Sequence, residues 1–193
     1  MIRPALLALT LLALGACRDE VAALPDPVTM TTEAVGHYCQ MNVLEHPGPK
    51  AQVHLVGLAN PLFFSQVRDA IAYQRMPEQS HAIRAIYVSD MGGGTDWDNP
   101  GTDNWIMATT AHYVIGAAIA GGMGAPELVP FSTLSEAQAF ARENGGRVAA
   151  LTEIPDDLVL APVNLDGAQP PPNADDDTDF QQRLRALSRQ LEG

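Results

Sequence analysis

Alternation of apolar and polar residues predicts two strands in the first half of the chain, with a helix between them. Residues 51–57 (AQVHLVG) and 82–90 (AIRAIYVSD) alternate in the manner of strands with one buried face. Residues 60–77 instead repeat apolar side chains at a spacing of four: Phe63, Val67 and Ile71. Asn60 suits the N-cap of this helix, and Pro61 suits its first position.

The second half of the chain repeats this order of elements. Residues 111–121 (AHYVIGAAIAG) predict a strand that ends in a glycine-rich turn. Residues 132–144 predict a helix, because Thr133 and Glu136 form a capping box and two glycines follow the last turn. Residues 147–151 (RVAAL) predict the returning strand. Strand, helix and strand therefore occur twice, which indicates an α+β fold with an internal duplication.

The N-terminus has the pattern of a secretory signal. In residues 1–16, Arg3 precedes an apolar run that is too short to span a bilayer and that ends in small residues. The junction LGAC resembles a bacterial lipobox, which implies cleavage before Cys17 and lipidation of its sulfur. Arg18 follows in place of an aspartate, and the known sorting rule then favours the outer membrane.

Composition divides the rest of the chain into three parts. Residues 17–34 mix charge, proline and threonine without a period, as a lipidated tether would. Residues 35–163 hold the predicted strands and helices and form the expected domain. Residues 164–193 are rich in proline and aspartate and predict an acidic, disordered tail.

The charge and cysteine content narrow the classes of function. Eleven basic residues against 23 acidic residues give a formal net charge of −12, which argues against binding of nucleic acid or anionic lipid surfaces. The chain has two cysteines. If Cys17 carries lipid, Cys39 is left as a lone thiol in an oxidising compartment, where such a thiol needs a reason to persist. A buried, inert cysteine is the plainest alternative.

The neighbours of Cys39 favour a soft metal ion. Met41 lies two residues further on, and an extended backbone would put both sulfur atoms on one face. Thiolate and thioether ligands select Cu(I), which tolerates two or three ligands. Zinc normally requires four ligands rich in cysteine and histidine, and the sequence shows no such motif.

Four residues are candidates to complete the site, and the pattern alone leaves the choice open. His37 precedes Cys39 by two residues and would share its face if the extended segment begins that early. His46 lies in the stiff segment HPGP, close to Cys39 in sequence. Met123 lies in AGGMGAPE, a glycine-rich loop that gives its side chain little local core to fill. Met91 has a similar setting in SDMGGG.

Four segments in this order resemble the NosL family of copper chaperone lipoproteins: CQMNVLEHPGPKAQ, AIYVSDMG, HYVIG and GGMGAPELVPF. The resemblance covers Val35 to Val163 and includes the lipobox. It implies Cu(I) binding by Cys39 and Met41, with Met123 as the matching downstream methionine and His46 as a further candidate. It also implies two ββαβ units forming one compact domain, related to the organomercurial lyase fold.

The resemblance further implies a place of action and partners. The chain would be lipid-anchored at the periplasmic face of a bacterial membrane and would deliver copper for the assembly of nitrous oxide reductase. Its direct partner would be the periplasmic copper-handling protein of the associated ABC transporter, and apo nitrous oxide reductase would be reached through it.

Two other classes of function are alternatives to a non-enzymatic chaperone. Cys39 could be a catalytic nucleophile with His46 or His112 as its base. Met41, however, has no role in such chemistry. The chain could also be a docking lipoprotein with a buried cysteine. An enzyme predicts turnover that copper inhibits, and a docking protein predicts no preference for Cu(I) over Zn(II).

Overall fold

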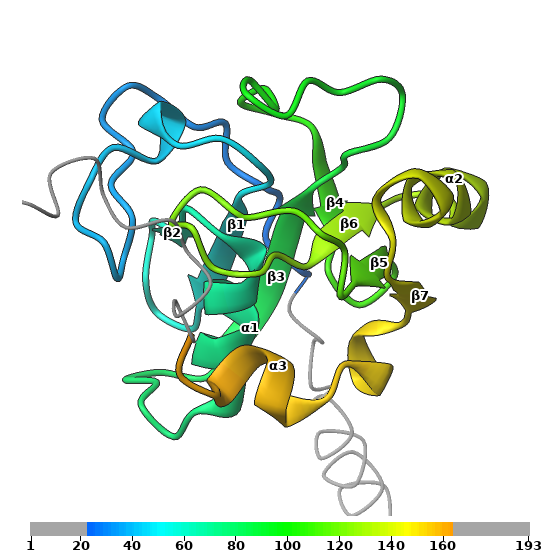
Figure 1. Ribbon diagram of the computed structural model, residues 1–193. Helices are drawn as coiled ribbons and strands as arrows, with labels where there is room; N and C mark the ends of the chain where they lie inside the picture. Colours follow the sequence, from blue (N-terminus) through cyan, green and yellow to red (C-terminus); the bar gives the residue numbers. More distant parts are fainter. Residues whose placement is uncertain (1–22, 164–193) are drawn as a thin grey trace, which may run out of the picture. The chain divides into compact units, whose positions relative to one another are not determined.

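The computed structural model describes residues 23–163, and the part up to Leu160 forms one compact unit with two sheets and few helices (Figure 1). The predicted signal, Cys17 and the acidic tail lie outside the described residues. The strands are β1 (Ala51–Leu55), β2 (Leu62–Phe64), β3 (Ile83–Ser89), β4 (Trp105–Met107), β5 (His112–Ile115), β6 (Val129–Phe131) and β7 (Arg147–Ala149). The α-helices are α1 (Val67–Arg75), α2 (Leu134–Asn144) and α3 (Asp156–Leu160).

The two sheets share one topology. The first has the order β2-β1-β3-β4 and the second has the order β6-β5-β7, with antiparallel pairing throughout. In each case two strands, a helix and a returning strand follow one another along the chain, and the first strand lies between the other two. The hydrophobic pattern predicted strand, helix and strand in each half and missed the short strands β2, β4 and β6, whereas the resemblance implied the ββαβ order that each unit shows.

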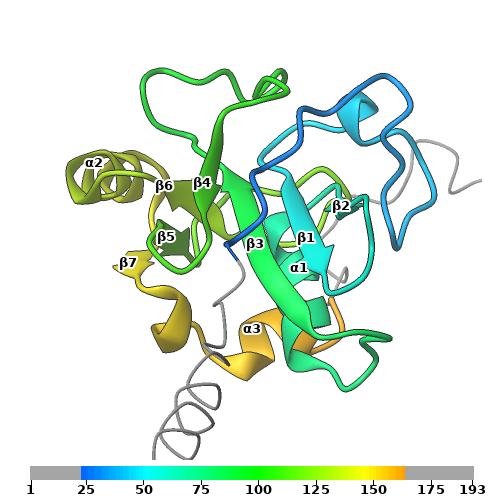
Figure 2. The same cartoon turned by 180° about the vertical axis from the view of Figure 1, so that it is seen from behind.

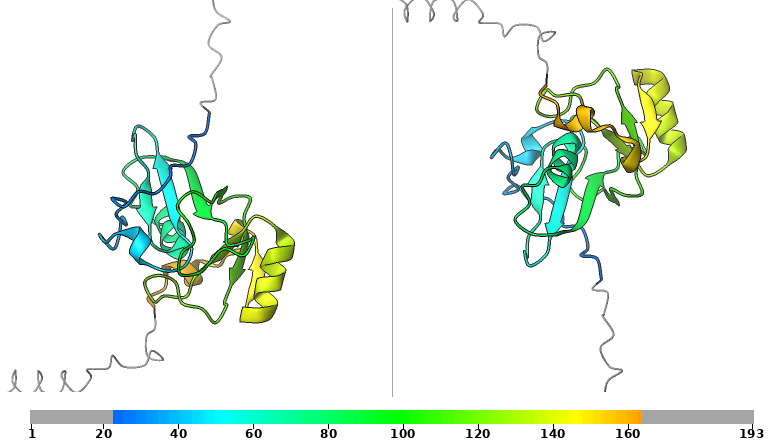
Figure 3. Two further views of the ribbon diagram at one scale, coloured as in Figure 1. Left: turned by 90° about the horizontal axis from the view of Figure 1, so that it is seen from above. Right: turned by 90° about the horizontal axis from the view of Figure 1, so that it is seen from below.

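A shared apolar core joins the two units. Val53 on β1 and Ile71 on α1 belong to the same buried cluster as Tyr113 and Ile115 on β5. Figure 3 shows α1 against the first sheet and α2 on the outer side of the second, where α2 packs on β5 and β7. Because the core crosses from one sheet to the other, the duplicated units form a single domain rather than two.

The helix predicted over residues 60–77 is shorter than expected and begins later. Leu62 to Phe64 pair with Val53 to Ala51 as an antiparallel strand, and α1 begins only at Val67. Asn60 and Pro61 therefore precede a strand instead of capping a helix. Phe63 therefore lies on β2, whereas Val67 and Ile71 lie on α1. Pairing with β1 decides the conformation of residues 62–64.

The helix predicted over residues 132–144 is confirmed, with its start at Leu134. Thr133 accepts a hydrogen bond from the Glu136 N–H at 3.4 Å and donates to its carboxylate at 2.5 Å. Gly145 and Gly146 adopt φ values of 77° and 84°, which end the helix as predicted.

The segment ahead of residue 35 packs on the first sheet. Figure 2 shows it crossing the face of β1 and β3 opposite α1. Gln52 bonds both the N–H and the C=O of Val28, and the Tyr87 hydroxyl donates to the Pro25 carbonyl at 2.6 Å. Met30 is buried at 3 % exposure. The folded part of the chain thus extends into the segment that composition marks as a tether.

No helix within residues 23–163 is long and apolar enough to cross a membrane.

Candidate metal centre

Cys39 lies in a tight turn, so the extended backbone expected around it was wrong. The Gln40 N–H donates to the Gly36 carbonyl and the Gly36 N–H donates to the Met41 carbonyl, both at 2.9 Å. Gln40 adopts a φ of 56°, and its side-chain amide donates to the His37 carbonyl at 2.7 Å. Since the left-handed residue reverses the chain between Cys39 and Met41, the two-residue period of a strand does not apply to them.

The Cys39 sulfur is half-buried and points to the first sheet. Its Sγ lies 3.2 Å from the Ser65 hydroxyl and 3.9 Å from the Met41 carbonyl. A Cβ on Gly36 would come within 2.4 Å of this sulfur, so only glycine allows the turn to close over it. No imidazole is among the hydrogen-bond partners found for Cys39 within the described residues, which leaves a nucleophilic thiol without a base.

Met123 reaches the same region from the other half of the molecule. It lies in the loop of residues 116–128 between β5 and β6, which extends across toward β2 in Figure 1. The Met123 N–H donates to the Gln66 side-chain oxygen at 2.6 Å. Gln66 directly follows Ser65, the contact of Cys39. The thioethers of Met123 and Met41 are both exposed, each residue at 42 %.

His46 is held by the same loop. Its Nδ1 lies 3.2 Å from the Gly122 carbonyl, which can only accept, so this nitrogen carries the proton. Nε2 then presents a lone pair. It is buried and has no hydrogen-bond partner within the described residues. A bare imidazole nitrogen fixed by a carbonyl at its other nitrogen is the usual state of a metal-ligating histidine.

Gly122 permits this close approach of the loop. A Cβ at this position would lie 2.7 Å from the Pro47 carbonyl, 2.8 Å from the His46 Cβ and 3.1 Å from the Ser65 carbonyl. Its φ is not in the left-handed region, so the requirement for glycine comes from contact alone. The HPGP segment and the glycine-methionine loop are therefore packed against each other.

Two buried ionisable groups, Glu127 at the end of the loop and Lys50, lie near this contact. Burial raises the pKa of Glu127 to about 8, although the N–H groups of Arg68 and Leu128 donate to its Oε1 at 3.0 and 2.8 Å. Burial lowers the pKa of Lys50 to about 8, while Glu127 opposes that shift. The Lys50 ammonium donates to the carbonyls of Pro47 and Gly48 at 2.9 and 2.5 Å, and so stiffens the segment that carries His46.

The remaining candidates lie elsewhere. Met91 is 8 % exposed and packs in the core cluster of Val114, Val129 and Phe131, so its side chain fills a core. His112 lies on β5 and pairs with Phe131 on β6. Sequence reasoning missed Ser65, Gln66 and Glu127, and no local pattern around them gives a signal for a site.

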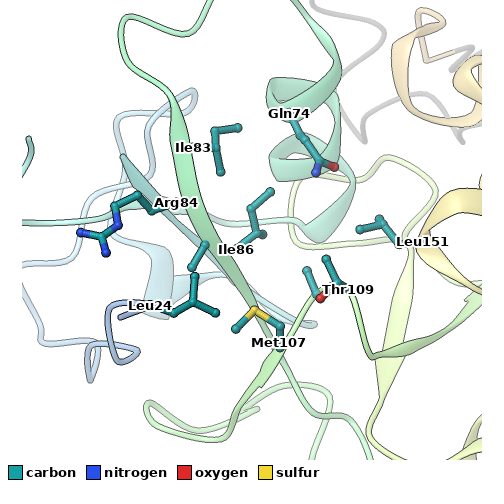
Figure 4. Close-up of a pocket in the computed structure, with 10 residues that line it drawn as sticks. Leu24, Gln74, Ile83, Arg84, Ile86, Met107, Thr109 and Leu151 are labelled. Atoms are coloured by element: carbon teal, nitrogen blue, oxygen red, sulfur yellow. The ribbon is translucent and has the colours of Figure 1, made fainter. Parts of the chain in front are cut away.

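Within the described residues, no three histidine, cysteine, aspartate or glutamate side chains lie close enough to hold a metal ion together. A site with three or more ligands that uses Cys39 would therefore need a ligand of another kind, such as a methionine thioether. A pocket of about 340 Å³ lies beside β3 and β4 (Figure 4), but none of Cys39, Met41, His46 and Met123 lines it.

Comparison with known proteins gives a consistent set of relatives. Residues 27–159 match the model of the NosL family. "Copper-binding lipoprotein NosL" of Achromobacter cycloclastes is 56 % identical over 187 residues, covering 96 % of this chain and 95 % of the relative. The protein of the same name from Stutzerimonas stutzeri is 34 % identical over 149 residues, covering 77 % and 76 % respectively. These names denote copper binding and no enzyme.

A solved structure has the same fold. The crystal structure of the copper chaperone NosL from Shewanella denitrificans superimposes with a TM-score of 0.61 at 29 % identity. The match covers 67 % of this chain and 97 % of that chain.

Proposed function

The chain belongs to the NosL family, and on that premise we propose that it is a Cu(I)-binding chaperone whose site is formed by Cys39, Met41, Met123 and His46. The observation that carries the proposal is the pair of contacts at Ser65 and Gln66. Ser65 touches the Cys39 sulfur and Gln66 binds the Met123 backbone, so two sulfur residues from opposite halves of the sequence each contact one of two adjacent residues.

The ligand chemistry suits a monovalent soft ion. A thiolate, thioethers and a neutral imidazole are ligands that Cu(I) prefers over hard cations. Ionised Cys39 would also balance the charge of the ion, and metal binding would protect this thiolate from oxidation. The buried, unpartnered Nε2 of His46 is the observation that favours histidine as a further ligand.

The exposure of the site suits transfer rather than storage. Met41 and Met123 are both exposed, whereas Cys39 is half-buried. An incoming thiolate, thioether or imidazole of a partner can therefore add to copper from the methionine side before Cys39 leaves. A closed site with four ligands would hold the ion more firmly and slow this exchange.

Delivery to nitrous oxide reductase belongs to the proposal as well. The partner is the periplasmic copper-handling protein of the maturation ABC transporter, and apo nitrous oxide reductase receives the copper through it. Cys17 carries the lipid that holds the chain at the periplasmic face of the membrane. Arg18, the residue that follows it, favours the outer membrane. The relation to the organomercurial lyase fold also stays a prediction.

Titration of the reduced protein with Cu(I) against a competing chelator tests the metal site. We expect one tightly bound copper ion, loss of tight binding in Cys39→Ala, and weakening by about tenfold or more in Met41→Leu and Met123→Leu. Met76→Leu is the matched control, because this methionine follows α1 and packs against the main core. Equal uptake by Cys39→Ala, or an equal preference for Zn(II), would reject the proposal.

Delivery and anchoring need separate measurements. Copper-loaded chain should transfer its ion to the purified periplasmic partner, and should pass less to it when Met123 is leucine. Cys17→Ala should leave the membrane fraction and appear in the soluble periplasmic fraction. Retention of this variant in membranes would overturn the lipid assignment while leaving the copper site untouched.

A further inference from the structure

We propose that Ser65 and Gln66 are positioning residues that together set the separation of the two halves of the copper site. They are adjacent residues where β2 meets α1, and each makes one hydrogen bond to a different half. This inference rests on the proposed function, because it concerns how its ligands are held.

Ser65 holds the cysteine half. Its side chain is 3 % exposed and its hydroxyl lies 3.2 Å from the Cys39 sulfur. A hydroxyl can donate one hydrogen to a thiolate and leave the other sulfur lone pairs for a metal ion. Because Phe64 pairs with Ala51 on β1, the backbone that carries Ser65 is fixed by the sheet. The sulfur is therefore held at a defined place before copper arrives.

Gln66 holds the methionine half. It is fully buried and occupies the N-cap position of α1, yet its side chain makes no capping hydrogen bond to the helix. Its oxygen instead accepts the Met123 N–H at 2.6 Å. The Gln66 side chain bonds a residue 57 positions away in sequence and does not cap its own helix. The loop that holds Met123 therefore sets its conformation.

Glu127 caps the start of α1, where the Gln66 side chain does not. Its carboxyl oxygen accepts the N–H of Arg68 in the first turn of α1. Glu127 follows Met123 in the same loop. Its carboxyl group accepts a hydrogen bond from the helix, and the Gln66 side chain at the helix start accepts one from the loop. This reciprocal exchange ties the start of α1 to the methionine loop by two independent hydrogen bonds.

Two adjacent residues, Ser65 and Gln66, therefore hold the two halves of the proposed site. The Gln66 amide nitrogen and the second Glu127 oxygen are both buried without partners within the described residues, and both groups face Gly121. Leaving two polar atoms unsatisfied costs stability, which a purely structural helix start would avoid. The same two side chains use their Oε1 atoms to hold the N–H groups of Arg68 and Met123.

The test measures Cu(I) affinity in Ser65→Ala and Gln66→Leu. Outer-shell partners of this kind typically change metal affinity by tenfold to a hundredfold, so we expect each variant to bind about tenfold more weakly. Two equally buried residues provide matched controls. Ser89→Ala removes a hydroxyl that accepts the Lys50 N–H, and Gln52→Leu removes a carboxamide that holds Val28. Both controls should lose stability and keep wild-type copper affinity.

Spectroscopy and a double-mutant cycle separate positioning from general damage. X-ray absorption of copper-loaded Gln66→Leu should show one sulfur scatterer fewer than wild type, as Met123→Leu should. Adding Gln66→Leu to Met123→Leu should cause no further loss of affinity, since Gln66 acts through Met123. Additive losses, or an unchanged sulfur count, would overturn the inference.

The outcomes distinguish the inference from the proposed function. If Met123→Leu binds copper as well as wild type, the proposed ligand set fails. If Met123→Leu is weakened but Gln66→Leu is not, only the positioning role fails. Should Gln66→Leu not fold, Gln66→Asn keeps a carboxamide that is one methylene too short to reach the Met123 N–H, and the same loss of affinity is expected.

Discussion

At the scale of single residues, Gly122 determines how near Met123 comes to the segment that carries His46. Three backbone and side-chain atoms lie within 3.1 Å of the place where its Cβ would stand. Two of them, the carbonyls of Pro47 and Ser65, belong to backbone that cannot swing aside. Any larger residue must therefore displace the loop itself.

Gly122→Ala should weaken Cu(I) binding by about tenfold while the domain stays folded, because the loop moves and Met123 moves with it. The measurement is a chelator competition combined with a thermal melt. Gly92→Ala is the control, since the atoms nearest to its new Cβ belong to the Glu136 side chain and to none of the proposed ligands. Wild-type affinity in Gly122→Ala would show that the close contact does not serve the site.

At the scale of elements, α1 and the loop of residues 116–128 depend on each other. The Glu127 carboxyl caps α1, and burial raises its pKa to about 8. Asp69 adds to this rise, whereas Lys50 and the two N–H donors oppose it. The folded state therefore keeps a proton on Glu127 at neutral pH, whereas the unfolded chain releases it near the ordinary pKa of a glutamate.

This proton makes stability depend on pH with a defined sign. Glu127 stabilises the fold fully below its unfolded pKa of about 4.5, and that contribution is lost as pH rises toward its folded pKa of about 8. Relative to Glu127→Gln, the wild-type free energy of unfolding should fall by about 1 kcal/mol per pH unit across this window. Denaturant unfolding at pH 5, 6.5 and 8 gives the slope, with exposed Glu45→Gln as control. Parallel curves for wild type and Glu127→Gln would contradict the prediction.

At the scale of the whole molecule, the segment of residues 23–34 is part of the folded unit. It covers the face of β1 opposite α1, which explains why all five residues of that strand are buried. Gln52 and His54 face this segment and share a hydrogen bond at 2.9 Å, while Val53 faces the core. Met30 completes a small cluster with Ala34 and Val43.

Met30→Ala should lower the free energy of unfolding by about 2 kcal/mol, because a buried methionine is truncated, and should leave Cu(I) binding unchanged. Met41→Ala should show the reverse pattern, since Met41 is exposed and lies in the proposed site. Denaturant unfolding and copper titration of both variants provide the check. Loss of copper affinity in Met30→Ala would mean that the cluster of Met30, Ala34 and Val43 supports the copper site directly.

The sequence by itself determined the repeated strand-helix-strand order and the cap and end of α2, and it supplied the prediction that Cys39 and Met41 bind a soft metal ion. These features depend on residue type and on spacing within a few turns of chain, which local physics fixes. It could not determine that residues 62–64 pair as a strand, that Gln40 reverses the chain, or that Met91 fills a core.

Only the tertiary structure placed Gly122 against His46 and gave Ser65, Gln66 and Glu127 their contacts. These contacts join residues 26 to 76 positions apart, so their formation depends on how two sheets pack around one core. Sequence spacing carries no information about such distances. The candidate ligand types were therefore predictable from the chain, whereas the contacts around them were decided by the fold.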